Sequence, residues 1–294
     1  MNASTSRLIL GAFLLLSALP VSAQGRLFAR PEQAGVVRST IVEEASGLVA
    51  SRAYPGTFWT HNDSGGKPTL YRLSAEAQII DSLALAVQDV DGGVTNRDWE
   101  DLAYATHPEG WGAILIAEIG DNLAQWPSVG VYVVPEVAER PRSGSAHPPV
   151  TFVELVYEDG ARDAETLLVD PMTGAWLVIT KREDRNRIYV AENPWAGRDT
   201  LRFVAELDLS WSTAGDVSPD GRAVVIKNYF RAFYWDLDEN TPLTETLQSP
   251  PRRIRYRREP QGEAIAFALD GNSYWTLSER RGERPQVFYR YTRR

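Results

Sequence analysis

The chain has 294 residues, no cysteine and a formal net charge of -8. Without cysteine it has no disulfide bonds and no thiolate metal sites, so a hydrophobic core must stabilise the fold, and 43% hydrophobic residues suffice for a large core. The acidic balance argues against nucleic acid as a partner.

The first predicted element is a secretory signal. Arg7 precedes an apolar run from Leu8 to Leu19, and Val21 to Ala23 has the small-x-small pattern of a signal-peptidase site. The run is too short to span a bilayer, which needs about 20 apolar residues. We therefore predict cleavage after Ala23, export to the periplasm or the extracellular space, no membrane span, and a single domain over residues 24–294.

The remaining sequence contains five similar segments, which begin at Glu44, Glu100, Glu165, Asp216 and Glu263. Each segment starts with a carboxylate, continues as a short apolar strand, turns at a step that contains glycine, and continues as a second apolar strand with a polar end. The turns read YPG, HPEG, DPMTG, SPDG and LDG, which are sequences that favour tight turns. By subtraction, the carboxylates lie 56, 65, 51 and 47 residues apart, a spacing typical of propeller blades.

Two further strands are predicted between successive segments, for example over residues 130–134 and 151–157 after the second segment. Four strands per repeat predict antiparallel blades and an all-β fold, a β-propeller with five blades by repeat count. The fourth segment predicts only a short inner strand from Asp216 to Gly221. Six blades are the alternative, if the linker from Pro135 to Pro149 contains irregular structure of its own.

The fifth repeat lacks an outer strand, because only the strand from Gln286 to Tyr291 follows its first two strands. The sequence Gly35–Val42, near the mature N-terminus, has the character of a strand. We predict that it supplies the missing edge and closes the ring, because joined ends leave no exposed strand edge.

Antiparallel pairing brings the start of each innermost strand and the end of the second strand to the same face of the ring. The polar side chains at these positions are therefore expected to converge at one mouth of the central channel. They are Glu44, His61, Asn62 and Asp63 in the first repeat; Asp98, Glu100, Asp101, Asp121 and Asn122 in the second; Asp163, Glu165 and Lys181 in the third; Asp216, Lys227 and Tyr229 in the fourth; and Glu263, Glu279 and Arg280 in the fifth.

Such a mouth concentrates negative charge. Two carboxylates roughly 6 Å apart repel each other by about 3 kcal/mol at an effective dielectric constant of about 20. Lys181, Lys227 and Arg280 can neutralise one side of the mouth, whereas the other side has no basic partner and mixes carboxylates with amides, which suits a hard cation such as calcium. The predicted calcium ligands are Glu44, Asn62, Asp63, Glu100, Asp121 and Asn122. Neutralisation within a scaffold that holds no metal is the alternative.

Other motifs are weak. The stretch Asp89–Glu100 resembles a calcium-binding loop in its acidic positions, but it has Val94 where that loop needs glycine. The three histidines, His61, His107 and His147, form no HExxH motif, which argues against a zinc protease. The sequence also contains no GxSxG, P-loop or GxGxxG motif.

The motifs WTHNDSGG, DWEDLA, IGDN, DAETLLVDPMTG, SPDG and QGEAIAF extend over nearly the whole mature chain. In this combination the chain resembles a group of exported bacterial β-propeller proteins, distantly similar to phytase-like and other calcium-binding six-bladed propellers. The resemblance implies the propeller fold more firmly than any activity. The count of five blades differs from the six of the better-known relatives, so the positions of their metal ligands are not transferred to this chain.

The leading functional hypothesis is a calcium-dependent hydrolase or lactonase-like enzyme that acts on a small phosphorylated or sugar-derived substrate. In it Glu165, Lys181 and Glu263 are catalytic, with Glu165 as the best candidate for the base. The residues expected to contact the ligand are His61, Asp163, Asp216, Lys227, Tyr229, Glu279 and Arg280.

The competing hypothesis is a non-catalytic binding or scaffold module of the cell envelope, because propellers serve both roles. A third hypothesis is a glycosidase, which requires two ring carboxylates about 5 Å or about 6.5 to 9.5 Å apart. The sequence indicates no particular protein partner.

Overall fold

The computed structural model describes residues 27–85, 93–138 and 150–294. The predicted signal over residues 1–23, the first residues of the loop Asp89–Glu100, His147 and most of the linker after Pro135 lie outside these ranges. The described residues form twenty β-strands, one short helix (α1, Leu243–Thr246) and one 3-10 turn (η1, Pro194–Ala196). The predicted all-β fold is therefore confirmed.

The first sheet is a meander of four antiparallel strands, in which each strand pairs with the next one in the chain. Its strands are β2 (Ala45–Ala50), β3 (Thr57–Asn62), β4 (Thr69–Ser74) and β5 (Ile79–Ala84). β2 is buried along its whole length, whereas alternate residues of β5 are exposed. β2 is therefore the innermost strand of this sheet and β5 its outermost strand.

Two further meanders join into one sheet of eight strands. One contains β6 (Trp99–Thr106), β7 (Gly112–Glu118), β8 (Val129–Pro135) and β9 (Thr151–Tyr157), and the other contains β10 (Ala164–Val169), β11 (Trp176–Thr180), β12 (Arg187–Ala191) and β13 (Arg198–Glu206). They meet at their outer strands, because residues 198–201 of β13 pair in parallel with residues 154–157 of β9. The separate blades that the repeat predicts are thus linked here by main-chain hydrogen bonds.

The last two sheets have four strands each. One contains β14 (Ser212–Val217), β15 (Ala223–Asn228), β16 (Ala232–Asp236) and β17 (Arg252–Ile254), and the other contains β18 (Gly262–Phe267), β19 (Ser273–Ser278), β20 (Gln286–Thr292) and β1 (Glu32–Val37). β1 pairs antiparallel with β20, so this sheet combines both ends of the described chain. The N-terminal strand lies earlier than the predicted range of Gly35–Val42.

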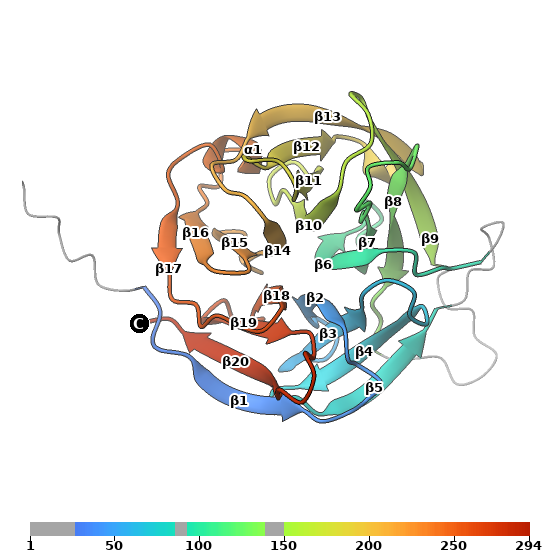
Figure 1. Cartoon of the computed structure of the whole chain (residues 1–294). Helices are drawn as coiled ribbons and strands as arrows, with labels where there is room; N and C mark the ends of the chain where they lie inside the picture. Colours follow the sequence, from blue (N-terminus) through green and yellow to red (C-terminus); the bar gives the residue numbers. More distant parts are fainter. Residues whose placement is uncertain (1–26, 86–92, 139–149) are drawn as a thin grey trace, which may run out of the picture.

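Figure 1 shows the sheets standing around a common centre, with β2, β6, β10, β14 and β18 innermost. These inner strands contact one another in the order β2, β6, β10, β14, β18 and again β2. A hydrophobic cluster lies between each two neighbouring strand groups; one of them, for example, joins Val49 of β2 to Leu102 of β6. The core is therefore divided among the interfaces between sheets, as in an arrangement of propeller blades.

The inner strand of the fourth unit begins earlier than the sequence predicts. β14 starts at Ser212 and contains Asp216 as its fifth residue, so the prediction that Asp216 opens a short inner strand is wrong. The prediction aligned the unit by its carboxylate, whereas the pairing of Ser212 with Asn228 places a serine at the start of the strand.

Candidate functional site

The innermost strands share a bulge near their starts, and the bulge determines which side chains enter the mouth. In β10, Glu165 lies between the paired residues Ala164 and Thr166, and in β18 Glu263 lies in the same way between Gly262 and Ala264. The register of β6 also shifts, across Glu100 and Asp101. A bulge re-aims the side chain of the extra residue. The equivalent residue of β14 is Thr213, so not every inner strand presents a carboxylate at its bulge.

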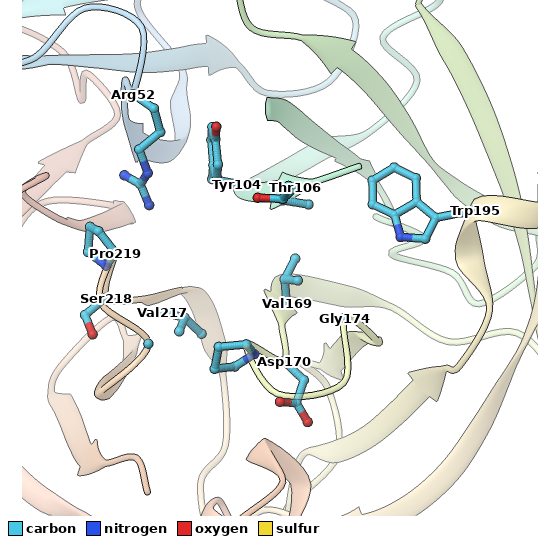
Figure 2. A pocket seen from close by; sticks show the side chains of 13 residues that line it. Arg52, Tyr104, Thr106, Val169, Asp170, Gly174, Trp195, Val217, Ser218 and Pro219 are labelled. Atoms are coloured by element: carbon cyan, nitrogen blue, oxygen red, sulfur yellow. The ribbon is translucent and has the colours of Figure 1, made fainter. Parts of the chain in front are cut away.

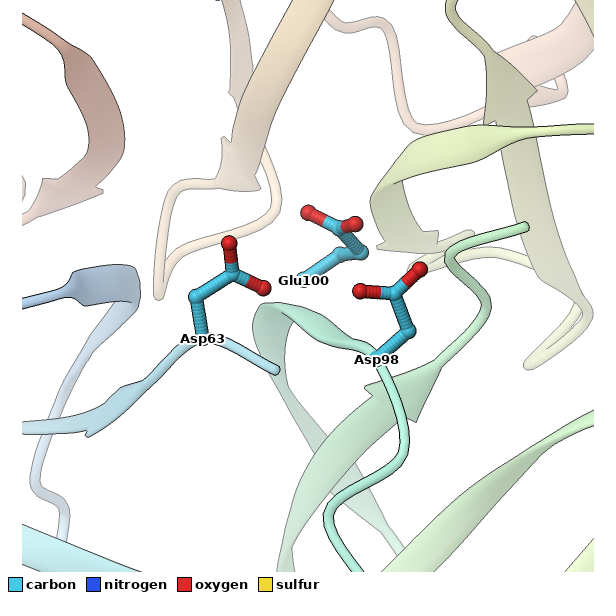
Figure 3. Close-up of side chains that lie close together, drawn as sticks. All are labelled: Asp63, Asp98 and Glu100. Carbon is cyan, nitrogen blue, oxygen red and sulfur yellow. The ribbon is translucent and has the colours of Figure 1, made fainter. Parts of the chain in front are cut away.

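A first group of carboxylates contains Asp63, Asp98 and Glu100. One oxygen of each lies within 4.8 Å of the others, and Figure 3 shows Asp63 facing Asp98 and Glu100, which come from one neighbouring segment. Asp63 follows the end of β3, Asp98 precedes β6, and Glu100 occupies the bulge of β6. The predicted convergence of strand starts and strand ends therefore occurs between the first and second units.

A second group contains Asp63, Glu263 and Glu279, again with oxygens within 4.8 Å of one another. Glu263 comes from the bulge of β18, and Glu279 follows the end of β19. Tyr229 donates a hydrogen bond of 2.5 Å to Glu263 Oε1. Because Asp63 belongs to both groups, the two form one continuous acidic surface, which we call the acidic cluster: Asp63, Asp98, Glu100, Glu263 and Glu279.

Burial and mutual repulsion disfavour the ionised form of several members. Burial, with the charge of Glu263, raises the pKa of Asp63 to about 7. Burial, and then the charge of Asp163, raises the pKa of Asp98. Burial, and then the charges of Asp63 and Asp98, raises the pKa of Glu100 well above its ordinary value. A bound cation would relieve this repulsion.

Glu263 and Glu279 differ although they are neighbours. Burial and a hydrogen bond to Glu263 raise the pKa of Glu279. Burial opposes ionisation of Glu263 as well, but the hydrogen bonds from Glu279 and Tyr229 outweigh it and hold the pKa of Glu263 below its ordinary value. The pair therefore holds one proton on Glu279 at neutral pH, as closely spaced carboxyls do.

Gly120 provides the space that the first group occupies. A Cβ at this residue would collide with Glu100 Oε1 and lie 2.5 Å from Asp98 Oδ2. Gly120 N also donates a hydrogen bond of 3.2 Å to the carbonyl oxygen of Asp98. The residue that follows β7 and Ile119 must therefore be glycine for Asp98 and Glu100 to approach each other.

Two residues that sequence reasoning missed hold the loops of the first group. Glu118 Oε1 accepts hydrogen bonds from the backbone nitrogens of Arg97 and Asp98, at 3.0 and 2.9 Å, and Glu118 Oε2 accepts one from Trp99 Nε1. Asn96 donates its side-chain amide to the carbonyl oxygens of Asn62 and Asp63, at 2.9 and 2.7 Å. The sequence feature that could have identified Glu118 is its position as a charged residue at the end of an apolar strand.

The basic side of the mouth is paired internally. Lys181 forms an ion pair with Glu165, and both are almost fully buried. Glu165 Oε2 is buried and has no hydrogen-bond partner among the described residues. Arg182, which the sequence analysis did not single out, forms a 2.6 Å ion pair with Asp163 and a hydrogen bond with Asn122.

Among the described residues, Lys227 forms no hydrogen bond or ion pair with a side chain of the acidic cluster. Its ammonium group donates to Thr213 Oγ1 at 3.1 Å and to the carbonyl oxygen of Gly262, and it is fully buried. Burial lowers its pKa to about 8. Glu259, with which it interacts, accepts hydrogen bonds from Thr276 and Tyr256. Lys227 therefore belongs to a buried polar network between neighbouring sheets.

Several predicted ligands have their polar atoms engaged elsewhere. Asn62 Oδ1 accepts from the backbone nitrogen of Glu44, and its amide donates to the carbonyl oxygen of Ile41. The Glu44 side chain is exposed. Asp121 Oδ2 accepts from the backbone nitrogens of Gln125 and Trp126, although its buried Oδ1 has no partner among the described residues.

Arg280 bonds the segment before β2 and forms no ion pair with the acidic cluster among the described residues. It bonds the carbonyl oxygen of Ser39 at 2.7 Å and pairs with Glu43 at 3.5 Å.

His61 is fully buried beneath the mouth. Its Nδ1 lies 2.8 Å from the carbonyl oxygen of Asn62, and its ring packs edge-on against Trp99. Burial lowers its pKa to about 4, so it is neutral at pH 7. Gly47, with a φ of +68°, makes room for the ring, because a Cβ there would lie 2.8 Å from His61 Nε2.

Asp216 lies toward the other end of the inner strands. Its Oδ2 accepts a hydrogen bond of 2.7 Å from the backbone nitrogen of Phe267, at the end of β18. Burial raises its pKa to about 7, and the charge of Arg52, beyond the end of β2, opposes that shift. Asp216 therefore joins two sheets and does not contribute to the acidic cluster.

Comparison with known proteins finds no matching family model and no matching curated protein. Among solved structures, the chain is similar to the PQQ-bound aldose sugar dehydrogenase from Streptomyces coelicolor, with 12% identity, a TM-score of 0.47, and coverage of 88% of this chain and 97% of that chain. Hydrazine synthase from Kuenenia stuttgartiensis matches with 10% identity and a TM-score of 0.40, over 81% and 93% of the two chains. The Dos1 propeller matches with 11% identity and a TM-score of 0.38, over 84% and 68%.

Structural similarity at these identities and TM-scores does not indicate which residues of this chain are functional. Within the described ranges, no helix has the length and apolar character needed to cross a membrane.

Proposed function

We propose that the protein is an exported, five-bladed β-propeller whose acidic cluster binds calcium and hydrolyses a small phosphorylated or sugar-derived substrate. The pairing of β1 with β20 supports a ring closed by its own ends. The eight-stranded sheet is, in this proposal, two blades joined at their rims.

The main support for the cation site is that Asp63, Asp98 and Glu100 converge and have no basic partner. Among the described residues, no lysine or arginine forms an ion pair with any of the three within 4.0 Å, and Glu100 makes no side-chain hydrogen bond. Their pKa values are raised, so the site is costly to ionise in the absence of a cation. Carboxylate oxygens at this spacing fit a hard divalent cation.

Calcium suits this site better than zinc or a softer metal because every donor is an oxygen. His61, the only histidine close by in the described ranges, is buried and turns its Nδ1 to a backbone carbonyl. The calcium ion would be held by Asp63, Asp98 and Glu100, and it would polarise a bound phosphate or carbonyl group.

Glu263 and Glu279 are suited to move protons beside this site. Glu263 is ionised and accepts a proton from an attacking water, whereas Glu279 is protonated and donates its proton to the leaving oxygen. Glu165, the base predicted from the sequence, is paired with Lys181, and a nearby cation weakens a carboxylate as a base. In this proposal Lys181, which Glu165 holds in place, instead orients an anionic substrate at the edge of the cluster.

Calorimetric titration of calcium into the chelator-treated protein tests the cation site. Wild type should bind, Glu100→Gln should bind at least tenfold more weakly, and Glu109→Gln, at an exposed turn, should match wild type. No binding by wild type, or equal binding by Glu100→Gln, would contradict the proposal.

Hydrolysis is tested separately with p-nitrophenyl phosphate and a sugar lactone. Turnover should depend on calcium and be lost in Glu263→Gln. Calcium binding without turnover of either class would favour the non-catalytic binding module instead.

A further inference from the structure

We propose that the protein has a second ligand site, at the end of the inner strands opposite to the acidic cluster, which binds a small organic anion: a ring that carries a carboxylate or a phosphate group. A cavity of about 330 Å³ lies there. Its wall includes residues that follow or end β2, β6, β10 and β14, whereas the acidic cluster lies at the strand starts. The cavity volume is in the range that suits small-molecule ligands.

Arg52 supplies the positive charge of this cavity. One of its guanidinium nitrogens donates to the carbonyl oxygen of Ala50 at 3.1 Å, and its Cζ lies 4.6 Å from the centre of the Tyr104 ring. No carboxylate within the described ranges forms an ion pair with Arg52. Since an arginine presents five donors, most of its hydrogen-bonding capacity remains for a carboxylate or phosphate group.

Glu136 fixes the backbone that presents Arg52. Its Oε2 accepts hydrogen bonds from the backbone nitrogens of Arg52 and Ala53, at 2.9 and 3.1 Å, and its Oε1 accepts from Ser51 Oγ and Trp59 Nε1. Both oxygens of the Glu136 carboxylate are therefore engaged by these donors. Three of these hydrogen bonds come from the turn Ser51–Ala53, so the backbone at Arg52 is fixed before a ligand binds, which lowers the entropy cost of binding.

Tyr104 places its ring against the guanidinium of Arg52 and also carries a hydroxyl group. Its side chain is half-buried, and the hydroxyl forms no hydrogen bond to another described residue. Gly112 makes the position possible, because a Cβ there would collide with the Tyr104 hydroxyl. Figure 2 shows the side chains of Arg52 and Tyr104 next to each other at one side of the cavity.

The opposite wall is apolar and aromatic. Trp195, from η1, is half-buried, and Val169 and Val217 line the cavity between the two walls. Asp170 also lines the cavity, but its carboxylate accepts hydrogen bonds from the backbone nitrogens of Met172 and Leu243. A ligand with an oxyanion at Arg52 and a compact ring toward Trp195 therefore matches both walls.

Calorimetric titration with phenyl phosphate and benzoate, in the presence of a chelator, tests this site. Both should bind, and inorganic phosphate and benzyl alcohol, each of which carries only half of the recognised chemistry, should bind more weakly. Arg52→Gln should weaken the binding of phenyl phosphate about tenfold or more, because it removes a charged hydrogen bond. Arg258→Gln is the matched control, since Arg258 also lies over an aromatic ring, that of Phe230 at 4.8 Å.

Two further variants distinguish weaker binding at this site from misfolding and from an effect of the acidic cluster. Tyr104→Phe keeps the ring and should weaken phenyl phosphate severalfold without a change in melting temperature. Glu100→Gln should bind phenyl phosphate as wild type does. Failure of both anionic ring compounds to bind wild type, or equal binding by wild type and Arg52→Gln, would overturn the proposal.

Discussion

Asp101 of β6 contacts the backbone of Leu167 of the neighbouring strand β10, with 3.1 Å between Asp101 Oδ2 and the Leu167 nitrogen. The same oxygen accepts a hydrogen bond of 3.1 Å from the nitrogen of Gly215, so one buried carboxylate from β6 joins β10 and β14. Asp101 is 0% exposed. It is therefore a central connection between three inner strands, lying below the acidic cluster.

We predict that Asp101→Ala destabilises the protein by about 2 to 4 kcal/mol, because the buried backbone nitrogens of Leu102, Leu167 and Gly215 lose their acceptor. Urea unfolding measures the change. Asp208→Ala, at a side chain that is 85% exposed, should change stability by less than about 0.5 kcal/mol. A loss for Asp101→Ala no larger than that of the control would show that the connection contributes little.

Calcium should raise the melting temperature of the chelator-treated protein. The gain in stability is RT ln(1 + [L]/Kd), which is about 2.7 kcal/mol at a hundredfold excess over Kd. Glu100→Gln should reduce this response strongly, whereas Glu165→Gln should largely keep it, because Glu165 pairs with Lys181. Thermal melts with and without calcium measure this response. An equal rise in melting temperature for both variants would show that Glu100 is not a calcium ligand.

Gly120→Ala should weaken calcium binding more than tenfold while the protein remains folded. The added Cβ meets the carboxylates of Glu100 and Asp98, which can rotate away but then no longer converge. Gly66→Ala is the matched control, because a Cβ there has its nearest neighbour at 3.4 Å, an ordinary contact. Titration calorimetry of both variants measures the effect, and unchanged binding by Gly120→Ala would mean that the cation lies elsewhere.

Without calcium, stability should fall as the pH rises from about 4 to about 7. The pKa of Asp63 is raised from 3.8 to about 7 in the folded protein, so in this window the folded state binds more protons than the unfolded chain. The slope is at most about 1.4 kcal/mol per pH unit for one group. Asp63→Asn should make the profile of melting temperature against pH shallower. Asp216 contributes in the same direction as Asp63, whereas His61, whose pKa is lowered from 6.5 to about 4, contributes in the opposite direction.

Calcium should flatten the same profile, because it favours the ionised carboxylates. Asp208→Asn, an exposed control, should leave the slope unchanged. A profile of Asp63→Asn that superimposes on that of wild type would show that Asp63 titrates normally.

Phe28 should be important for holding the N-terminal segment in place. Its ring is 1% exposed, lies 4.7 Å from that of Tyr274 and 5.9 Å from that of Tyr234. Phe28→Ala should therefore cost about 3 to 5 kcal/mol in urea unfolding. Phe230→Ala, at a ring that is 52% exposed, should cost far less. Equal losses would mean that the segment before β1 contributes nothing specific.

The repeat could be found from the sequence because its turns and apolar strands recur, and Glu100, Glu165 and Glu263 were placed correctly at the starts of inner strands. The fourth unit was misaligned because its strand start carries Ser212 and Thr213, and a search for carboxylates moves to Asp216 instead. A hydroxyl can occupy this position because the bulge, not the charge, is the shared feature.

Which polar groups face the ligand could not be read from the sequence. Asn62 and Arg280 lie near the mouth, yet both bond the segment before β2. The sequence predicts the position of a polar residue along a strand. It does not predict which backbone group that residue bonds, because the partner often lies far away in the chain. The roles of Glu118 and Asn96 were missed for the same reason.

The pairing of β1 with β20 has a consequence for how the chain is made. Val37 pairs with Gln286, so a partner for β1 is synthesised 249 positions later, by subtraction. At a translation rate of 5 to 20 residues per second, β1 waits roughly 12 to 50 seconds for that partner. The intervening units can meanwhile assemble from neighbouring strands, and β1 remains available to bind other chains until β20 has been synthesised.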